Sequence, residues 1–154
     1  MKNKLMIIIS CTLLLLAAGC KKDKLSDEPE TLFGSVEKPS WKVPDEYDYS
    51  SSMTAVVKVE KLNGQIINDE IINAADMLAA FAGDVCVGVA SPTDGLFFLY
   101  ISKPEQEQDG DITLRYWSAH YNRLFEAKDA FVFQHDMNLG TIAAPFIPQM
   151  TAVE

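Results

Sequence analysis

Residues 77–90 read MLAAFAGDVCVGVA, two apolar runs that only Gly83 and Asp84 separate. Glycine readily adopts the positive φ angles that tight turns require, and runs of this length are typical of strands. The stretch therefore predicts a β-hairpin with a two-residue turn. Because strands this apolar need cover on their faces, the hairpin also indicates a β-rich core.

The segments on either side of this hairpin have a similar character. Upstream, residues 53–60 alternate with period 2 and have one fully apolar face, and Asn63-Gly64 follows as a strong signal for a second hairpin. Downstream, a turn at 91–95 precedes runs that we expect to be strands, at 96–101, 111–117, 123–126 and 130–133. Residues 140–148 are apolar but contain two prolines, so we expect an edge or an extended cover there.

The pattern as a whole predicts an all-β protein. Short strands separated by Gly, Pro and Asn turns favour an antiparallel β-sandwich of the immunoglobulin-like or jelly-roll type. The one alternative concerns residues 71–80, because Ala, Met and Leu also favour helices. We consider a helix there chiefly as a single turn near residues 73–76.

The first twenty residues predict export and lipid attachment. Lys2 and Lys4 precede an apolar run at 5–18, and Ala17-Ala18-Gly19 supplies the small residues that a signal peptidase needs. Cys20 follows directly, which resembles a bacterial lipobox, whose cysteine becomes a diacylglyceryl cysteine, with fatty acids such as palmitate, at the mature N-terminus. An ordinary secretory signal is one alternative. A transmembrane anchor is the other, although the run is shorter than the roughly 20 residues that a spanning helix needs.

The same resemblance bears on location and domain organisation. Lys21 stands where inner-membrane lipoproteins carry Asp, so we expect a lipid anchor in the outer membrane, at its periplasmic face or at the cell surface. We expect a signal peptide at 1–19, a lipidated flexible tether at 20–40 and the β-sandwich at 41–154. The charged, Pro- and Gly-containing composition of 20–40 indicates the tether, and an edge strand around residues 32–36 is the alternative.

Charge and cysteine content restrict the partners. The chain has 13 basic and 22 acidic side chains and a net charge of −9, which argues against binding to nucleic acid or to anionic headgroups. The predicted cut would remove two lysines and no acid, so the mature chain would carry 11 basic against 22 acidic side chains, or −11. Apart from the lipidated Cys20, the mature chain would contain only Cys86, so we expect no internal disulfide.

No pattern in the sequence indicates catalysis. Cys86 with His120 or His135 would make a thiol–imidazole pair, but a cysteine in the middle of an apolar strand is typically a buried hydrophobe. We therefore expect no enzyme, no cofactor and no zinc-type metal site. The acidic loop at 105–111, with Glu105, Glu107, Asp109 and Asp111, is either a calcium-binding loop or only a solvated one.

The turn at 116–123 is the candidate ligand-binding site. Aromatic rings beside imidazole and guanidinium donors suit a sugar ring, which offers an apolar face and polar edges. The residues concerned are Tyr121, His120, Trp117, Tyr116 and Arg123. The alternative is that the sandwich buries these aromatic side chains in its core.

Taken together, these segments resemble a β-sandwich module of Gram-negative bacteria. That module recurs in surface lipoproteins and near the C-terminus of secreted multidomain proteins, including those exported by type IX secretion. The similarity covers residues 52–145 and is most specific in DMLAAFAGDVCVGVASP at 76–92. Val87 and Ser118 depart from it, because the module usually has Arg and Asp there.

The resemblance implies a function without catalysis. It predicts an accessory, adhesion or structural module whose partner is an envelope or surface protein. The alternative is a lipoprotein that binds polysaccharide through the aromatic side chains of the 116–123 turn.

Overall fold

The computed structural model describes residues 36–45, 50–103 and 110–154. The predicted signal peptide, the predicted lipidation site Cys20 and most of the predicted tether lie outside the described residues, as do residues 105–109 of the acidic loop. No helix in the described part of the chain is long and apolar enough to cross a membrane.

The predicted central hairpin is confirmed. β4 (Met77–Ala82) pairs with β5 (Val85–Ala90), and Gly83 has a φ of 58° in the turn between them. A bulge between Ala80 and Phe81 leaves Val87 as the extra residue on β5. Val87 is buried in the main core, which suits the apolar residue that this chain carries there.

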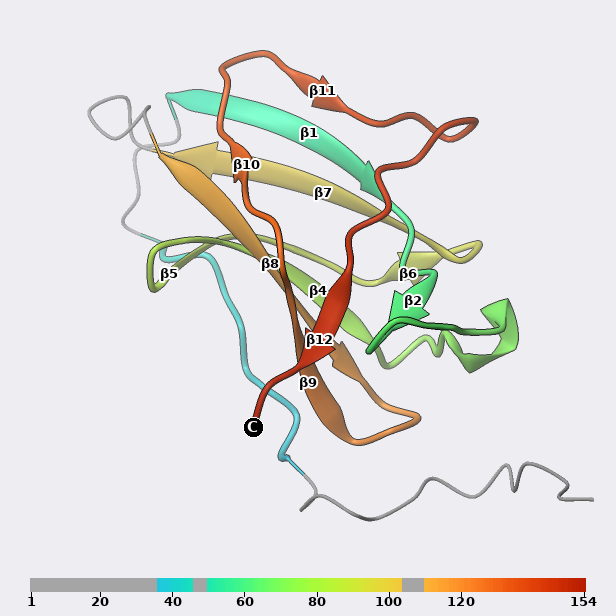
Figure 1. Cartoon of the computed structure of the whole chain (residues 1–154). Coiled ribbons are helices and arrows are strands. Elements are labelled where there is room, and N and C mark those ends of the chain that lie inside the picture. Colours follow the sequence, from blue (N-terminus) through green and yellow to red (C-terminus); the bar gives the residue numbers. More distant parts are fainter. Residues whose placement is uncertain (1–35, 46–49, 104–109) are drawn as a thin grey trace, which may run out of the picture.

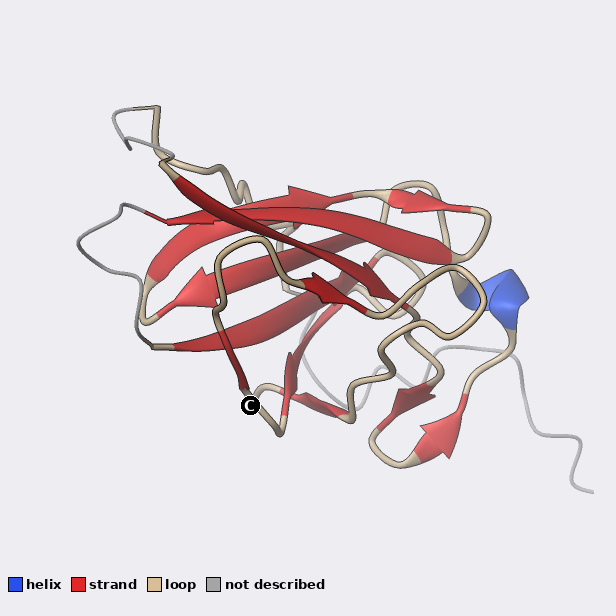
Figure 2. Cartoon of the chain, turned by 90° about the horizontal axis from the view of Figure 1, so that it is seen from above, coloured by secondary structure: helices blue, strands red, loops and turns tan. Residues whose placement is uncertain are grey.

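The hairpin belongs to the larger of two sheets that pack as a β-sandwich (Figures 1 and 2). The smaller sheet, which we call sheet A, has in spatial order β11 (Asn138–Leu139), β1 (Ser51–Val57), β7 (Leu96–Lys103) and β6 (Pro92–Thr93). The larger, sheet B, has β3 (Gln65–Ile66), β2 (Lys61–Leu62), β12 (Met150–Ala152), β9 (Arg123–Ala127), β8 (Asp111–Ser118), β4 and β5, and β10 (Phe131–Val132) also pairs with β8.

The all-β sandwich prediction is confirmed and most strand pairs are antiparallel, but both sheets are mixed. β11 runs parallel to β1, and β12 runs parallel to β2. Both β11 and β12 come from the C-terminal part of the chain, which reaches its partners over long connections and is therefore free to enter in the parallel sense. Within residues 140–148, Phe146 forms an isolated bridge with Val57 beside β1.

The helical alternative for residues 71–80 does not hold, because 77–80 belong to β4 and residues 73–76 form a turn closed by a 2.8 Å hydrogen bond from Asp76 N to Asn73 O. The only helical element among the described residues is the 3-10 turn η1 (Asp69–Ile71), which Figure 2 shows in blue. The side chain of Asn68 accepts a hydrogen bond from Glu70 N at its start. Residues 77–80 form a strand because Leu78 and Ala80 face the main core while Ala79 is buried on the opposite face of the sheet.

The main core fills the space between the two sheets. On β8 the predicted inward face, Ile112, Leu114 and Tyr116, is completely buried. Sheet A contributes the alternate positions of β1 and β7, which are Met53, Ala55, Val57, Phe97, Leu99 and Ile101. At Gly88 a Cβ atom would lie 2.7 Å from the carbonyl oxygen of Tyr100, so only glycine lets β5 approach β7 this closely.

A second, smaller cluster lies on the outer face of sheet B. Residues 36–45, which we call the strap, run beside β5 (Figure 1, cyan), and Trp41 packs edge-on against Phe81 with ring centroids 5.7 Å apart. The strap helps to bury Ala79 and Cys86. Its residues 36–40, part of the predicted tether, contact the domain, because Val36 N donates to Asn122 O over 3.0 Å.

Candidate functional site

The structure separates the residues of the predicted 116–123 site into buried and exposed groups. Tyr116 is completely buried in the main core. Trp117, 5 % exposed, faces the other side of sheet B, where the ammonium group of Lys38 lies 5.4 Å from the centre of its ring. Neither ring presents a face on which a sugar can stack.

Tyr116 is held by a buried carboxylate that the sequence analysis did not single out. Asp76 accepts hydrogen bonds from the Tyr116 hydroxyl over 2.6 Å and from Ala119 N over 2.7 Å. It also accepts one from Asn73 N over 3.0 Å. Burial, followed by this hydrogen bond to Asp76, raises the pKa of Tyr116 far above its ordinary value. Asp76 therefore ties the start of β4 to the end of β8, which is a structural role.

The other three residues of the predicted site lie at or near the surface. The rings of His120 and Tyr121 meet edge to face at 4.6 Å, and Tyr121 also packs against Phe125 at 6.3 Å. His120 is exposed, whereas Tyr121 and Arg123 are half-buried. Partial burial raises the pKa of Tyr121. Two adjoining rings thus remain accessible at this turn, a smaller platform than the sequence suggested.

The residues considered for catalysis lie in three separate surroundings. Cys86 is buried beneath the strap, where burial raises the pKa of its thiol. His135 Nδ1 makes a 2.9 Å hydrogen bond with the hydroxyl of Ser51, and His120 contacts Tyr121. Among the described residues no three His, Cys, Asp or Glu side chains gather as metal ligands. Of the acidic loop, the structure describes Asp111, which is exposed at the start of β8.

The outer face of sheet A carries a feature that was not predicted. Phe98 and Tyr100 of β7 are 45 % and 59 % exposed, and both point away from the core. Across the strand pair, Val56 lies opposite Phe98 and Thr54 lies opposite Tyr100. Residues at alternate positions of one strand share a face, so the two aromatic side chains and their partners form one continuous surface.

This surface, which we call the aromatic face, is uncharged. The Thr54 hydroxyl donates to the side-chain oxygen of Asn138 on β11 over 2.5 Å, which extends the face with polar but neutral groups. No described segment packs over it in the way that the strap packs over sheet B. The run LFFLYI does contain the signal, because a buried Phe97, Leu99 and Ile101 imply that the residues between them point outward.

Comparison with protein-family models, curated proteins and solved structures finds no match to this chain. Its function is therefore argued from its own residues.

Proposed function

We propose that the protein is a lipid-anchored, non-catalytic module of the bacterial outer membrane that binds a partner protein through the aromatic face of sheet A. The observation that carries this proposal is the joint exposure of Phe98 and Tyr100 on one continuous, uncharged surface. Aromatic side chains are enriched in protein interfaces and charged ones are depleted from interface cores. Interface hot spots are enriched in Trp, Tyr and Arg.

The setting of this face in the molecule supports a docking role. The chain carries a net charge of −9, yet Thr54, Val56, Phe98, Tyr100 and Asn138 are all neutral. β1 and β7 pair over seven successive residues, so the face is rigid and little ordering is needed on binding. An adhesion or structural module needs such a preformed surface and no reactive group.

The proposed partner contact can be tested with a photo-reactive phenylalanine analogue placed at position 100 in living cells. We expect one discrete covalent protein adduct. The matched control places the analogue at Ile66, which is 80 % exposed on β3 at the far edge of the other sheet and should give no such adduct. Failure to cross-link from both positions 98 and 100, or the same adduct from position 66, would contradict the proposal.

The lipid anchor needs a separate experiment because it rests on the sequence around Cys20. In the Cys20→Ser variant we expect the protein to leave the membrane fraction, since acyl chains provide its attachment. Cys86→Ala serves as the matched control, because this cysteine is buried in the domain and its variant should stay with the membrane. Membrane association of the Cys20→Ser variant would contradict lipidation.

Glycan binding at the 116–123 turn remains the second candidate, supported by the adjoining rings of His120 and Tyr121. A panel of polysaccharides distinguishes it from the first. Saturable binding that is lost in Tyr121→Ala and kept in Tyr100→Ala would favour the glycan-binding function.

A further inference from the structure

A half-open hollow lies near the edge of sheet B, between the β2–β3 turn, β12 and the residue after β9. Its volume is about 370 Å³. The turn between β2 and β3 forms one wall, the residue after β9 forms the other, and β12 with the residue before it forms the floor. The polar and glycine residues that line it are Lys61, Asn63, Gly64, Lys128, Gln149 and Thr151. A hollow of this size accommodates a ligand of about the size of one or two sugar rings.

Three hydrogen bonds hold the walls of this hollow to its floor. Asn63 N donates to Met150 O over 2.8 Å, and Ala152 N donates to the side-chain oxygen of Asn63 over 2.8 Å. On the other wall, Lys128 N donates to Gln149 O over 2.9 Å. Asn63 and Gly64 have φ angles of 52° and 80°, as the predicted tight turn requires. The hollow is therefore preformed.

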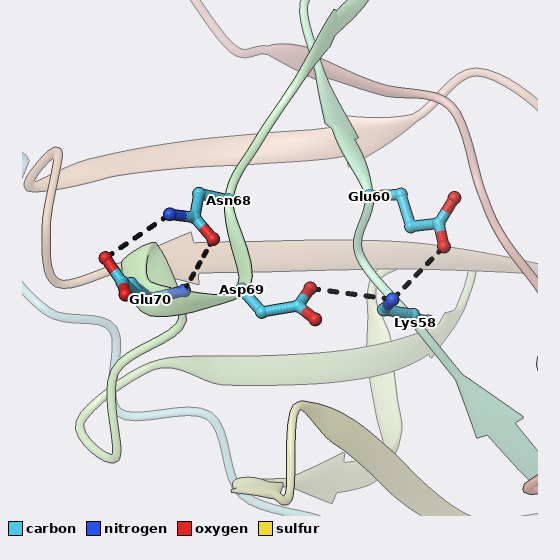
Figure 3. Close-up of polar contacts among 5 residues, drawn as sticks. All are labelled: Lys58, Glu60, Asn68, Asp69 and Glu70. Atoms are coloured by element: carbon cyan, nitrogen blue, oxygen red, sulfur yellow. Dashed lines mark hydrogen bonds and ion pairs between the residues drawn. The ribbon is translucent and has the colours of Figure 1, made fainter.

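The two lysines of the hollow lack acidic partners. Lys61 and Lys128 are both exposed, and neither makes an ion pair with any acid that the structure describes. Lys58 is the contrast: its ammonium group lies 3.3 Å from Glu60 and 3.5 Å from Asp69, and Figure 3 marks both ion pairs. The hydrogen bond to Glu60, followed by the charge of Asp69, raises the pKa of Lys58. The two lysines of the hollow thus carry positive charges that no described acidic side chain pairs with, although the chain as a whole is acidic.

We propose that this hollow binds a small organic ligand that carries an oxyanion, with Lys61 and Lys128 as its charge partners. The side-chain amides of Asn63 and Gln149 offer donors for neighbouring hydroxyl groups, because Asn63 uses its oxygen toward Ala152 and keeps its NH₂ group. The net charge of −9 favours a small anion over a polyanion, since a long anionic polymer would be repelled by the rest of the surface. A carboxylated monosaccharide has the required charge, size and hydroxyl groups.

The test follows the backbone amide signals of the full chain in a non-ionic detergent during titration with glucuronate, inorganic phosphate or glucose. We expect glucuronate to shift the amide signals of Gly64 and Thr151, and glucose to leave them unchanged. If phosphate shifts these amide signals as strongly as glucuronate does, the site recognises the anionic group alone. If phosphate shifts them less, the hydroxyl groups of glucuronate contribute to binding. Either result supports an oxyanion site. Salt should weaken binding, because exposed charges are screened.

Variants of the two lysines make the proposal falsifiable. We expect Lys61→Ala and Lys128→Ala each to weaken binding about two- to fivefold, the usual range for exposed charge pairs, and the double variant to weaken it about four- to 25-fold. Lys42→Ala is the matched control, because Lys42 is exposed on the strap and already paired with Asp45. An absent shift with both anions, an equal shift with glucose, or unchanged affinity in the double variant would overturn the site. None of these outcomes bears on cross-linking from position 100.

Discussion

The two outer faces of the sandwich differ in what lies over them. On sheet B, the strap brings Trp41 against Phe81 and helps to bury Cys86. On sheet A, Phe98 and Tyr100 are just as aromatic and stay exposed. Full burial of a side chain such as Phe contributes about 1.5–3 kcal/mol. Phe98 and Tyr100 do not gain this contribution in the isolated protein, and a partner that covers them would provide it. The covered face contributes to stability, and the open face is the one to which our proposal assigns binding.

The largest effect on stability should come from Asp76, whose carboxylate ties the start of β4 to the end of β8 in sheet B. In Asp76→Ala the Tyr116 hydroxyl and two backbone N–H groups lose their acceptor. The buried Tyr116 hydroxyl left without a partner costs about 1–3 kcal/mol and the two less buried N–H groups cost less, so we expect a loss of about 2–4 kcal/mol in the free energy of unfolding. Urea denaturation measures it.

Two further substitutions sharpen that result. Asp76→Asn keeps one acceptor oxygen and should cost less than Asp76→Ala. Asp129→Ala removes an exposed carboxylate and should change stability by less than about 0.5 kcal/mol. If Asp76→Ala is no more destabilising than Asp129→Ala, Asp76 does not tie β4 to β8.

The second prediction concerns a substitution that uncovers part of the outer face of sheet B, so that it resembles the open face of sheet A. Trp41→Ala removes the ring that packs on Phe81, and the half-buried position makes a loss of about 1–3 kcal/mol reasonable. We also expect the Cys86 thiol to react faster with a thiol reagent, because the strap helps to bury it. The neighbouring Lys42→Ala should leave both the free energy of unfolding and the reaction rate unchanged. An unaltered reaction rate in Trp41→Ala would show that the strap does not shield the thiol.

The third prediction concerns alkaline pH. The pKa of Tyr116 is raised in the folded protein, whereas in the unfolded chain it is about 10. The folded state thus keeps a proton that the unfolded state loses, so this contribution to stability is complete below pH 10 and falls as the pH rises above it. Its slope is at most about 1.4 kcal/mol per pH unit.

Tyr116→Phe separates this titration from the hydrogen bond to Asp76. Below pH 10 the variant should be less stable by about 1–2 kcal/mol, because Asp76 loses one donor. Above pH 10 the difference between the two proteins should shrink, since the variant no longer has a hydroxyl to titrate. Denaturation midpoints between pH 8 and 11 measure this. Parallel curves over that range would contradict the role given to Tyr116.

Local signals explain which parts of the fold could be predicted. The hairpin turns at Asn63-Gly64 and Gly83-Asp84 and the inward face of β8 depend on neighbouring residues, so the sequence shows them. β11 and β12 are only two and three residues long, and their partners are distant in the chain. Such short elements have no periodicity of their own, and only the assembled sheets define them.

The candidate sites were predicted less well for the same reason. Alternation along β8 correctly places Tyr116 and Trp117 on opposite faces, but it cannot show that both faces are covered. Trp117 is buried on the face over which the strap passes, and the charged composition around Lys38 indicated a flexible tether instead. The aromatic face, by contrast, follows from the alternation in LFFLYI, in which Phe98 and Tyr100 lie between buried residues.

The smallest effect on stability should come from the open face, and this prediction bears most directly on function. Phe98→Ala removes a side chain that is 45 % exposed, so the free energy of unfolding should fall by less than about 1 kcal/mol. The same substitution should abolish cross-linking from position 100, because truncating an aromatic anchor typically costs an interface 2 kcal/mol or more. A variant that stays stable but no longer binds its partner is the result expected when the substituted residue belongs to a docking surface. A Phe98→Ala protein that is as destabilised as Trp41→Ala would instead mean that the two faces do not differ, and that Phe98 is held by contacts within its own chain.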